Sequence, residues 1–238
     1  MRREFTHLNF PIGLLQKAFI DIRSTMNDIM DYAVYVRAIS FYHEGKIENS
    51  VYKAAHNDFG IKLGNPQNSA SNGKILFESK TKKAPMTGIS KKTCFDFYDN
   101  EKTESEIAVL LAYLAIKSII GTKPYVHITN EFLIARMGGF PSIKAIPEEL
   151  PEPLAKFATR RRLDKIKFEL RKSWNVTIYG FRVRGFYVSI ENQFSLEDLI
   201  YEVEKRRKSA TEMKLRQKQN EAILKAKTKL RNELDSRK

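Results

Sequence analysis

The sequence is poor in the residues on which disulfide-stabilised and metal-binding domains depend. Its one cysteine, Cys94, excludes an internal disulfide bond and any metal site built on several cysteines, and this fits a reducing compartment. The histidines do not stand at the spacing of metal ligands either; they are His7, His43, His56 and His127. We therefore expect no metal and no other cofactor.

Long apolar runs are also missing. The longest extends from Ile107 to Ile116, about half of the roughly 20 residues that a membrane-spanning helix needs. The residues after Met1 are polar and basic rather than continuously apolar, so we expect no signal peptide. These absences predict a soluble, cytoplasmic protein without a membrane partner.

Catalytic motifs are scarce. The sequence has no Walker loop and no Gly-x-Gly-x-x-Gly loop, so nucleotide hydrolysis has no support, and we expect no enzyme. A metal-dependent nuclease is the minor alternative. Asp58 followed by Glu78-Ser79-Lys80 has the loose form of a site in which two carboxylates hold Mg²⁺ and a lysine steadies the attacking water. Glu44-Gly45-Lys46 illustrates how easily Glu-x-Lys arises by chance in this composition.

Acidic residues are outnumbered, and the excess of positive charge is local. The chain has 42 Lys and Arg against 28 Asp and Glu, for a formal net charge of +14. Residues 156–184 contain ten basic and two acidic side chains, and residues 201–238 contain thirteen and six. The rest of the chain is close to neutral. Two basic segments on a near-neutral body favour a polyanionic partner over a general effect on solubility.

Residues 1–100 are expected to form a helical region that supplies dimerisation or partner contacts. Apolar residues spaced by three and four predict a long amphipathic helix over 14–42 and a shorter one over 47–59. The Asn-, Ser- and Gly-rich segment 64–73 predicts a loop. Two short strands are expected, at 74–77 and 94–98.

The next segment, residues 104–190, predicts an ordered series of elements. A helix up to Gly121 and a short strand over 125–128 precede a helix that Thr129 caps and Gly138-Gly139 ends. A long basic helix over 154–172 follows, then two alternating strands around a turn with Arg182 and Arg184. Residues 140–153, with several prolines, separate the two helices.

The long basic helix carries the strongest functional signal. On a helical wheel, Leu163, Ile166 and Leu170 share one narrow arc, which predicts the core face. The opposite side is cationic, with Phe168 beside it, and such a face suits the major groove or the phosphates next to it. The alternative is a solvated basic helix without a partner. The candidate nucleic-acid-binding residues are Arg160, Arg161, Lys165, Phe168 and Lys172 in the helix, and Arg182 and Arg184 in the turn.

Residues 104–190 resemble the winged helix-turn-helix superfamily of DNA-binding domains. The resemblance rests on the order of the elements, on the helix Asn130 to Met137 before the turn, and on the arginine-bearing hairpin. It implies that the helix 154–172 is the recognition helix and that the wing 179–185 reaches the backbone or the minor groove of double-stranded DNA. Bacterial transcription regulators and plasmid replication initiators both use this fold, so we expect a transcription regulator or a replication initiator. The style of the sequence suggests a bacterium or a mobile element as its source, and a homodimer stays open. The insertion 140–153 departs from the usual short turn.

The expected fold is therefore mostly α with a small β-hairpin wing, an α+β protein. It would combine the helical N-terminal region, a winged helix domain over 104–190 and a basic helical tail over 196–238. Apolar residues in the tail keep no clean heptad, so we expect a solvated helix rather than a coiled coil. A structural or protein-interaction module with a basic helical arm is the alternative function. Trp174 is expected to be largely buried against the helix at 107–119.

Overall fold

The computed structural model describes residues 6–45, 48–61, 65–80, 83–180, 185–191 and 193–235. Residues 1–193 form one compact unit and residues 194–238 form a second. The described elements are mostly helices, accompanied by two small antiparallel sheets. The chain is therefore an α+β protein in the coarse sense that the sequence predicts.

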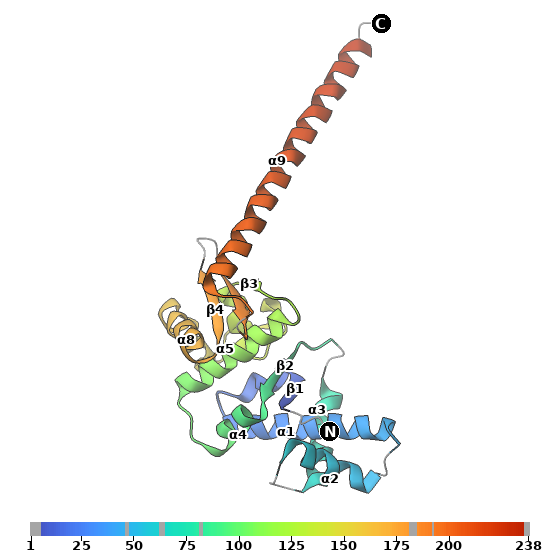
Figure 1. The fold of residues 1–238 in the computed structure, drawn as a ribbon, viewed down its shortest axis with the longest axis vertical. Coiled ribbons are helices and arrows are strands. Elements are labelled where there is room, and N and C mark those ends of the chain that lie inside the picture. Colours follow the sequence, from blue (N-terminus) through green and yellow to red (C-terminus); the bar gives the residue numbers. More distant parts are fainter. Residues whose placement is uncertain are drawn as a thin grey trace. The chain divides into compact units, whose positions relative to one another are not determined.

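The N-terminal part of the first unit is built around one long helix, α1 (Ile22–His43), which packs against α2 (Glu48–Phe59), α3 (Pro66–Ser79) and α4 (Lys91–Asp99). Figure 1 shows these helices in the blue to green part of the chain. Strand β1 (His7–Pro11) precedes the 3-10 helix η1 (Ile12–Lys17) and pairs antiparallel with β2 (Met86–Ser90), so that Leu8 lies opposite Ile89.

Four expectations for this part were wrong in detail. The long helix begins at Ile22 rather than near residue 14, because the Asp21 carboxylate accepts a hydrogen bond from the Ser24 amide at 2.8 Å and caps it there. The segment 64–73, expected as a loop, and the strand expected at 74–77 lie mostly in α3. The strand expected at 94–98 lies inside α4, whose first turn Ser90 caps by accepting from the Thr93 amide at 3.0 Å.

The helix α3 forms because local caps and tertiary packing override its loop-like composition. The Asn65 side chain accepts a hydrogen bond from the Gln67 amide at 2.9 Å, and Pro66 occupies the first helical position. Gly73 faces α1 so closely that an added Cβ would collide with the Asp31 carbonyl oxygen. The glycine that suggests a loop from sequence therefore permits close contact between two helices.

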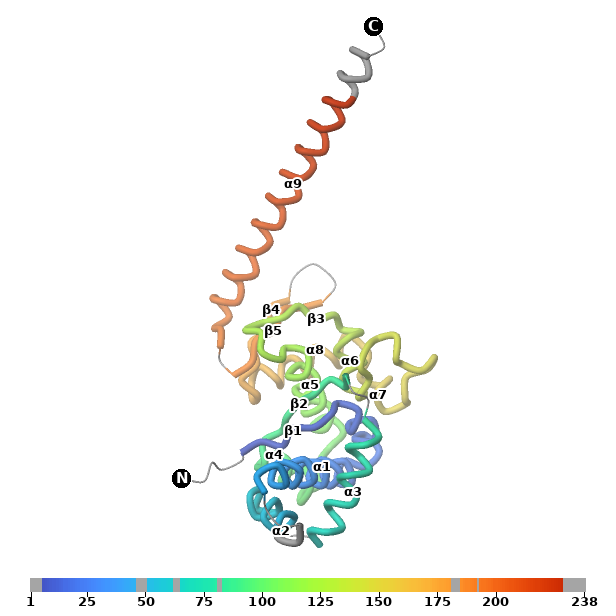
Figure 2. The backbone as a smooth tube through the Cα atoms, turned by 90° about the vertical axis from the view of Figure 1, so that its right-hand side faces the viewer, coloured from blue at the N-terminus to red at the C-terminus, as the bar shows by residue number. Residues whose placement is uncertain are grey.

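The C-terminal part of the first unit follows the expected order of elements. Its helices are α5 (Glu104–Ile120), α6 (Asn130–Met137), η2 (Ile143–Ala145), α7 (Glu152–Phe157) and α8 (Arg160–Ser173), and its strands are β3 (Val126–Ile128), β4 (Val176–Gly180) and β5 (Phe186–Ile190). The three strands form an antiparallel sheet in the order β3-β5-β4, and Figure 2 shows them side by side. Thr129 caps α6, as expected, by accepting from the Phe132 amide at 3.2 Å.

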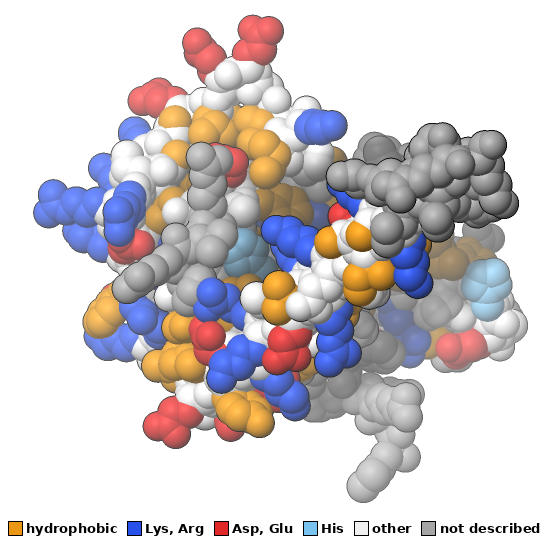
Figure 3. All heavy atoms as spheres, turned by 90° about the horizontal axis from the view of Figure 1, so that it is seen from above, with side chains coloured by type: hydrophobic (Ala, Val, Ile, Leu, Met, Phe, Trp, Pro, Cys, Tyr) orange, Lys and Arg blue, Asp and Glu red, His pale blue; other side chains and the backbone are white. Residues whose placement is uncertain are grey.

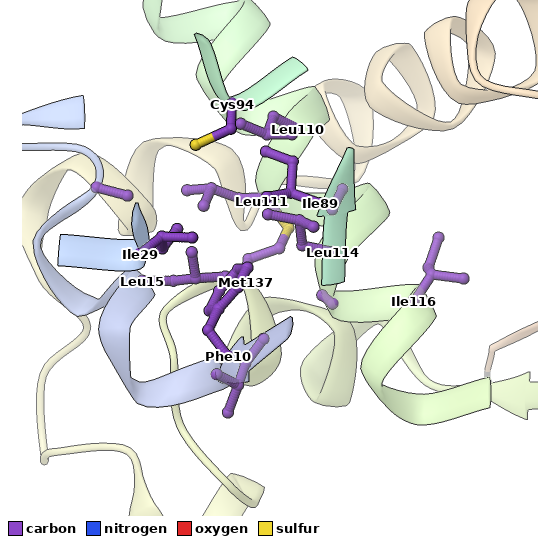
Figure 4. Packing of buried hydrophobic residues seen from close by; sticks show 14 of the residues in the cluster. Phe10, Leu15, Ile29, Ile89, Cys94, Leu110, Leu111, Leu114, Ile116 and Met137 are labelled. Carbon is purple, nitrogen blue, oxygen red and sulfur yellow. The ribbon is translucent and has the colours of Figure 1, made fainter. Parts of the chain in front are cut away.

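One hydrophobic core joins the two parts of the first unit. Figure 4 shows Phe10 and Leu15 from the N-terminal part close to Met137 of α6 and Leu114 of α5, and all four side chains are fully buried in the same cluster. The division that the sequence suggested between residues 100 and 104 falls within this unit. The segment 104–190 therefore shares its core with the residues before it.

In the described part of the second unit, the one regular element is the helix α9 (Leu196–Asp235). The Ser195 hydroxyl accepts a hydrogen bond from the Asp198 amide at 3.1 Å and caps its first turn. Residues 208–228 are exposed, including Met213 at 58% and Leu224 at 63%. Among the residues that the structure describes, every helix is too short or too polar to span a lipid bilayer.

Candidate nucleic-acid interface

The basic segment expected as one helix over 154–172 consists of two helices, α7 and α8, and this expectation was wrong. Thr159, between them, has an extended backbone (φ −73°, ψ 144°), and its carbonyl accepts the first hydrogen bond of α8 from the Leu163 amide at 3.0 Å. β-branched threonine favours such a position before a helix over one inside it. The candidate recognition helix therefore begins at Arg160.

The inner face of α8 is the predicted one. Leu163, Ile166 and Leu170 are at most 4% exposed and belong to the common core. Trp174, at the C-terminal end, packs its ring against Tyr113 of α5 with centroids 4.8 Å apart. The tryptophan contacts the expected helix and is partly buried against the core. These contacts fix the rotation of α8, and with it the direction in which the remaining side chains point.

The outer face of α8 brings together five of the seven candidate residues. Arg160, Arg161, Lys165, Phe168 and Lys172 are all exposed. Figure 3 shows lysine and arginine side chains gathered at the left edge of the view, the side on which α8 lies in Figure 1. Arg182 and Arg184 lie outside the described residues, so the structure describes only the helical part of the expected site.

Lys167 is a basic residue of α8 whose side chain packs against the rest of the domain and not on the outer face. Its Nζ donates a hydrogen bond to Asn130 Oδ1 at 2.9 Å and lies 4.5 Å from the ring centroid of Phe186. Burial lowers the pKa of Lys167, and the carboxylate of Asp164, 3.7 Å away, opposes this effect. The lysine thereby links α8 to α6 and β5.

The acidic side chains near α8 compensate little of its charge. Asp164 lies 3.9 Å from Arg160 Nε, in a pair that is exposed on both sides, and such exposed pairs contribute at most about 1 kcal/mol. Lys156 and Glu104 form a similar exposed pair at 3.7 Å. Arg161, Lys165 and Lys172 thus face solvent on the side opposite the core.

A broad depression of about 1470 Å³ adjoins α8. The residues that line it include the apolar Phe97, Val109 and Ile166 and the cations Lys102 and Arg162. These two cations were not among the sequence candidates, because Arg162 lies between the core face and the outer face and Lys102 lies in a loop before α5. The Lys102 ammonium forms a 2.8 Å ion pair with Asp96, which lowers the pKa of that carboxyl group.

Aromatic side chains form cross-strand contacts in the hairpin next to α8. Tyr179, Tyr187 and His127 are direct neighbours across β4, β5 and β3. The ring centroids of the two tyrosines are 6.5 Å apart, and those of Tyr187 and His127 are 4.9 Å apart. Such cross-strand pairs stabilise a sheet, so the two strands that lead into the segment 181–184 are held in a fixed register.

The residues of the possible nuclease site have separate partners. Asp58 forms a 2.9 Å ion pair with Arg37, and Lys80 Nζ donates to the Tyr32 hydroxyl at 3.0 Å. Glu78 lies 3.9 Å from Lys74. Within the described ranges, the structure contains no cluster of three or more His, Cys, Asp or Glu side chains that could hold a metal ion. The outer face of α8 is therefore the site with the most consistent chemistry.

Comparisons of the chain with protein-family models, with curated proteins and with solved structures found no match.

Proposed function

We propose that the chain is a cytoplasmic protein that binds double-stranded DNA through the outer face of α8, as a bacterial or mobile-element transcription regulator or replication initiator. The single observation that carries the proposal is the separation of the two faces of this helix. Leu163, Ile166 and Leu170 are buried on one side, and Arg161, Lys165 and Lys172 are exposed on the other. A helix of this kind can enter the major groove and contact phosphates on both sides.

The start of α8 supports a polyanionic partner. Its first turn holds Arg160, Arg161 and Arg162 and no acidic residue. Because the N-terminal end of a helix carries a partial positive charge, acidic residues stabilise this position and basic residues oppose it. Three arginines therefore lower the stability of the isolated helix, and a bound phosphate backbone would reverse that effect.

The topology around α8 supports the winged-helix interpretation. The sheet order β3-β5-β4, with β3 before α6 and the hairpin after α8, agrees with the order of parts that the sequence resemblance implies. In this interpretation α8 is the recognition helix and the segment 181–184 is the tip of the wing. The short helices η2 and α7 occupy the insertion between α6 and α8.

A charge-reduced helix tests the proposal. The triple variant Arg161→Ala, Lys165→Ala, Lys172→Ala should fold normally, because all three side chains lie opposite the core. Its affinity for a mixed-sequence duplex should fall, and the slope of log K against log salt should flatten by about 0.9 for each phosphate that the variant no longer neutralises. Titrations of a labelled duplex at several salt concentrations measure both quantities.

A matched control separates the effect of this face from the effect of total charge. Lys53, Lys74 and Lys83 are exposed on α2, on α3 and before β2, and changing them to alanine removes the same charge far along the chain from α8. This control should bind like the unmodified protein. Equal affinity and equal slope for the α8 variant would refute the assignment and favour a structural or protein-interaction role for this part of the chain.

A further inference from the structure

Phe168 is the large apolar side chain on the outer face of α8. Its side chain is 55% exposed. Its neighbours on that face are all basic and are also exposed: Arg161, Lys165 and Lys172. These four residues follow one another at intervals of four, three and four, so they form one stripe along the helix. Single exposed apolar residues are common on protein surfaces, so exposure alone does not indicate a binding role for Phe168. Its position within the basic stripe does.

The stripe has cations at its ends and the aromatic ring between them. At 1.5 Å per residue, Phe168 lies roughly 10 Å along the axis from Arg161 and roughly 6 Å from Lys172. Long flexible side chains at such distances can reach the phosphates that border a groove about 12 Å wide. The shorter and more rigid phenyl ring would then face the edges of the bases.

The chemistry of a phenyl ring limits what it can recognise there. It neither donates nor accepts a conventional hydrogen bond, so it cannot read the donor and acceptor pattern of the bases. The major groove of B-form DNA offers one apolar group, the C5 methyl of thymine, and phenylalanine is among the side chains that contact it. The deep, narrow major groove of A-form RNA excludes such a contact.

We infer that Phe168 contacts the methyl group of thymine in the major groove and makes the protein selective for thymine-containing DNA. The inference rests on the proposed function, since it assumes that α8 enters the groove of a duplex. It adds a specificity-determining residue to that function. The three cations hold the helix on any sequence, whereas Phe168 distinguishes a thymine from uracil and from the other bases.

The test combines a change in the protein with a change in the DNA. The full-length protein first selects its best duplex from a random pool, and this duplex is then prepared with deoxyuridine in place of every thymidine. The unmodified protein should bind the uracil duplex about fourfold more weakly for each thymine methyl group that the ring touches. Phe168→Ala should bind both duplexes with equal affinity, while Phe168→Leu should retain part of the preference.

The matched control is Tyr42→Ala, which removes another partly exposed aromatic ring, 39% exposed on α1. It should keep the full preference for the thymine duplex. A Phe168→Ala variant that keeps the preference, or an unmodified protein that has none, would overturn the inference and leave duplex binding in place. Stronger dependence on Phe168 with single-stranded DNA than with the duplex would also overturn it. If the unmodified protein binds no duplex at all, the proposed function itself fails.

Discussion

At the residue scale, two buried side chains hold nitrogen atoms that have no hydrogen-bond partner in the described part of the chain. Arg136 of α6 is 8% exposed, and its Nε and Nη1 atoms find no partner among the described residues. Its guanidinium carbon lies 5.0 Å from the ring centroid of Phe132. Burial lowers the pKa of Arg136, since taking a charged group out of water is unfavourable.

We predict that Arg136→Met leaves the stability unchanged or increases it. Methionine has a similar length, retains the contacts of the aliphatic stem and avoids the cost of burying an unpaired charge. The melting temperature of the variant, compared with that of the parent at equal concentration, measures this. A loss of more than about 2 kcal/mol in the free energy of unfolding would contradict this cost of burial and point to a partner that stabilises the arginine.

His56 of α2 should make stability depend on pH. The side chain is 4% exposed, and its Nε2 atom has no partner among the described residues. Burial lowers the pKa of His56, while the Ile61 backbone and the Asp31 carboxylate oppose this effect. Because the folded-state pKa lies below the ordinary 6.5, the folded chain binds fewer protons than the unfolded chain between these two pKa values. The free energy of unfolding therefore rises with pH in this range, and the contribution of His56 is lost as the pH falls through it.

The pH prediction is tested by urea unfolding at pH 5.0 and pH 7.5. The free energy of unfolding should be smaller at pH 5.0, and His56→Gln should reduce that difference even if the variant is less stable at both values. His43, an exposed histidine at the end of α1, provides His43→Gln as the matched control. If His56→Gln leaves the difference in free energy of unfolding between the two pH values unchanged, other groups cause the effect. His7 is one candidate, because burial also lowers the pKa of that side chain.

At the element scale, the elements with clear apolar periodicity were predictable from the sequence. The inner face of α8 and the start of α6 at Thr129 agree with the sequence pattern, because a buried stripe and a side-chain cap are local signals. The helix α3 has a local start signal in Asn65-Pro66, but its glycine indicates a loop, since the position of Gly73 against α1 is a tertiary contact that the sequence does not show. The break at Thr159 has only one weak local signal, a β-branched residue within an otherwise strong helical pattern.

The same distinction applies to the candidate site. Charge and periodicity alone indicate Arg161, Lys165, Phe168 and Lys172, and the structure places all of them on the exposed side of α8. Lys102 escaped prediction because no sequence pattern links it to α8; only the fold brings the loop before α5 beside that helix. The local sequence therefore indicates which side chains lie on the exposed face of one helix, but not which loops lie beside that helix.

The long helix α9 gives a prediction at this scale. Four acidic residues of α9 are followed four residues later in the same helix by a basic one, as in Glu212 with Arg216 and Glu221 with Lys225, an arrangement that stabilises an exposed helix. Its lysines and arginines can track phosphates without reading bases. Deleting residues 205–238 should barely change the melting temperature and should weaken binding to all duplexes by a similar factor, so that the ranking of sequences is kept.

The competing role for α9 is self-association. A triple variant removes charge but keeps the length of the helix: Lys214→Gln, Arg216→Gln, Lys218→Gln. It should weaken duplex binding in the same direction as the deletion, but by less. Sedimentation of the full and truncated chains without DNA provides the second measurement. A dimer that becomes a monomer on truncation, together with unchanged duplex affinity in the glutamine variant, would identify α9 as an oligomerisation helix.

At the scale of the whole molecule, the continuous core of residues 1–193 predicts cooperative unfolding. Cys94 reports on the N-terminal part, because it is fully buried and burial raises the pKa of its thiol to about 12, so it should react only after unfolding. Trp174, the single tryptophan, reports on the C-terminal part. The urea dependence of thiol labelling and of tryptophan fluorescence should have the same midpoint. Two separate midpoints would show that the parts fold independently.

The packing of α5 has a consequence for how this chain can be recombined with others. Every residue from Ile107 to Ala112 is buried, because η1 and β2 cover one side of the helix while α6 and α8 cover another. A helix enclosed in this way has a central segment that is apolar all round and has to be covered by its neighbours. The segment 104–190 therefore cannot be exchanged as an independent domain. A chimera that moved it to a different N-terminal partner would expose apolar residues of α5, whereas a junction near residue 194 would leave them covered.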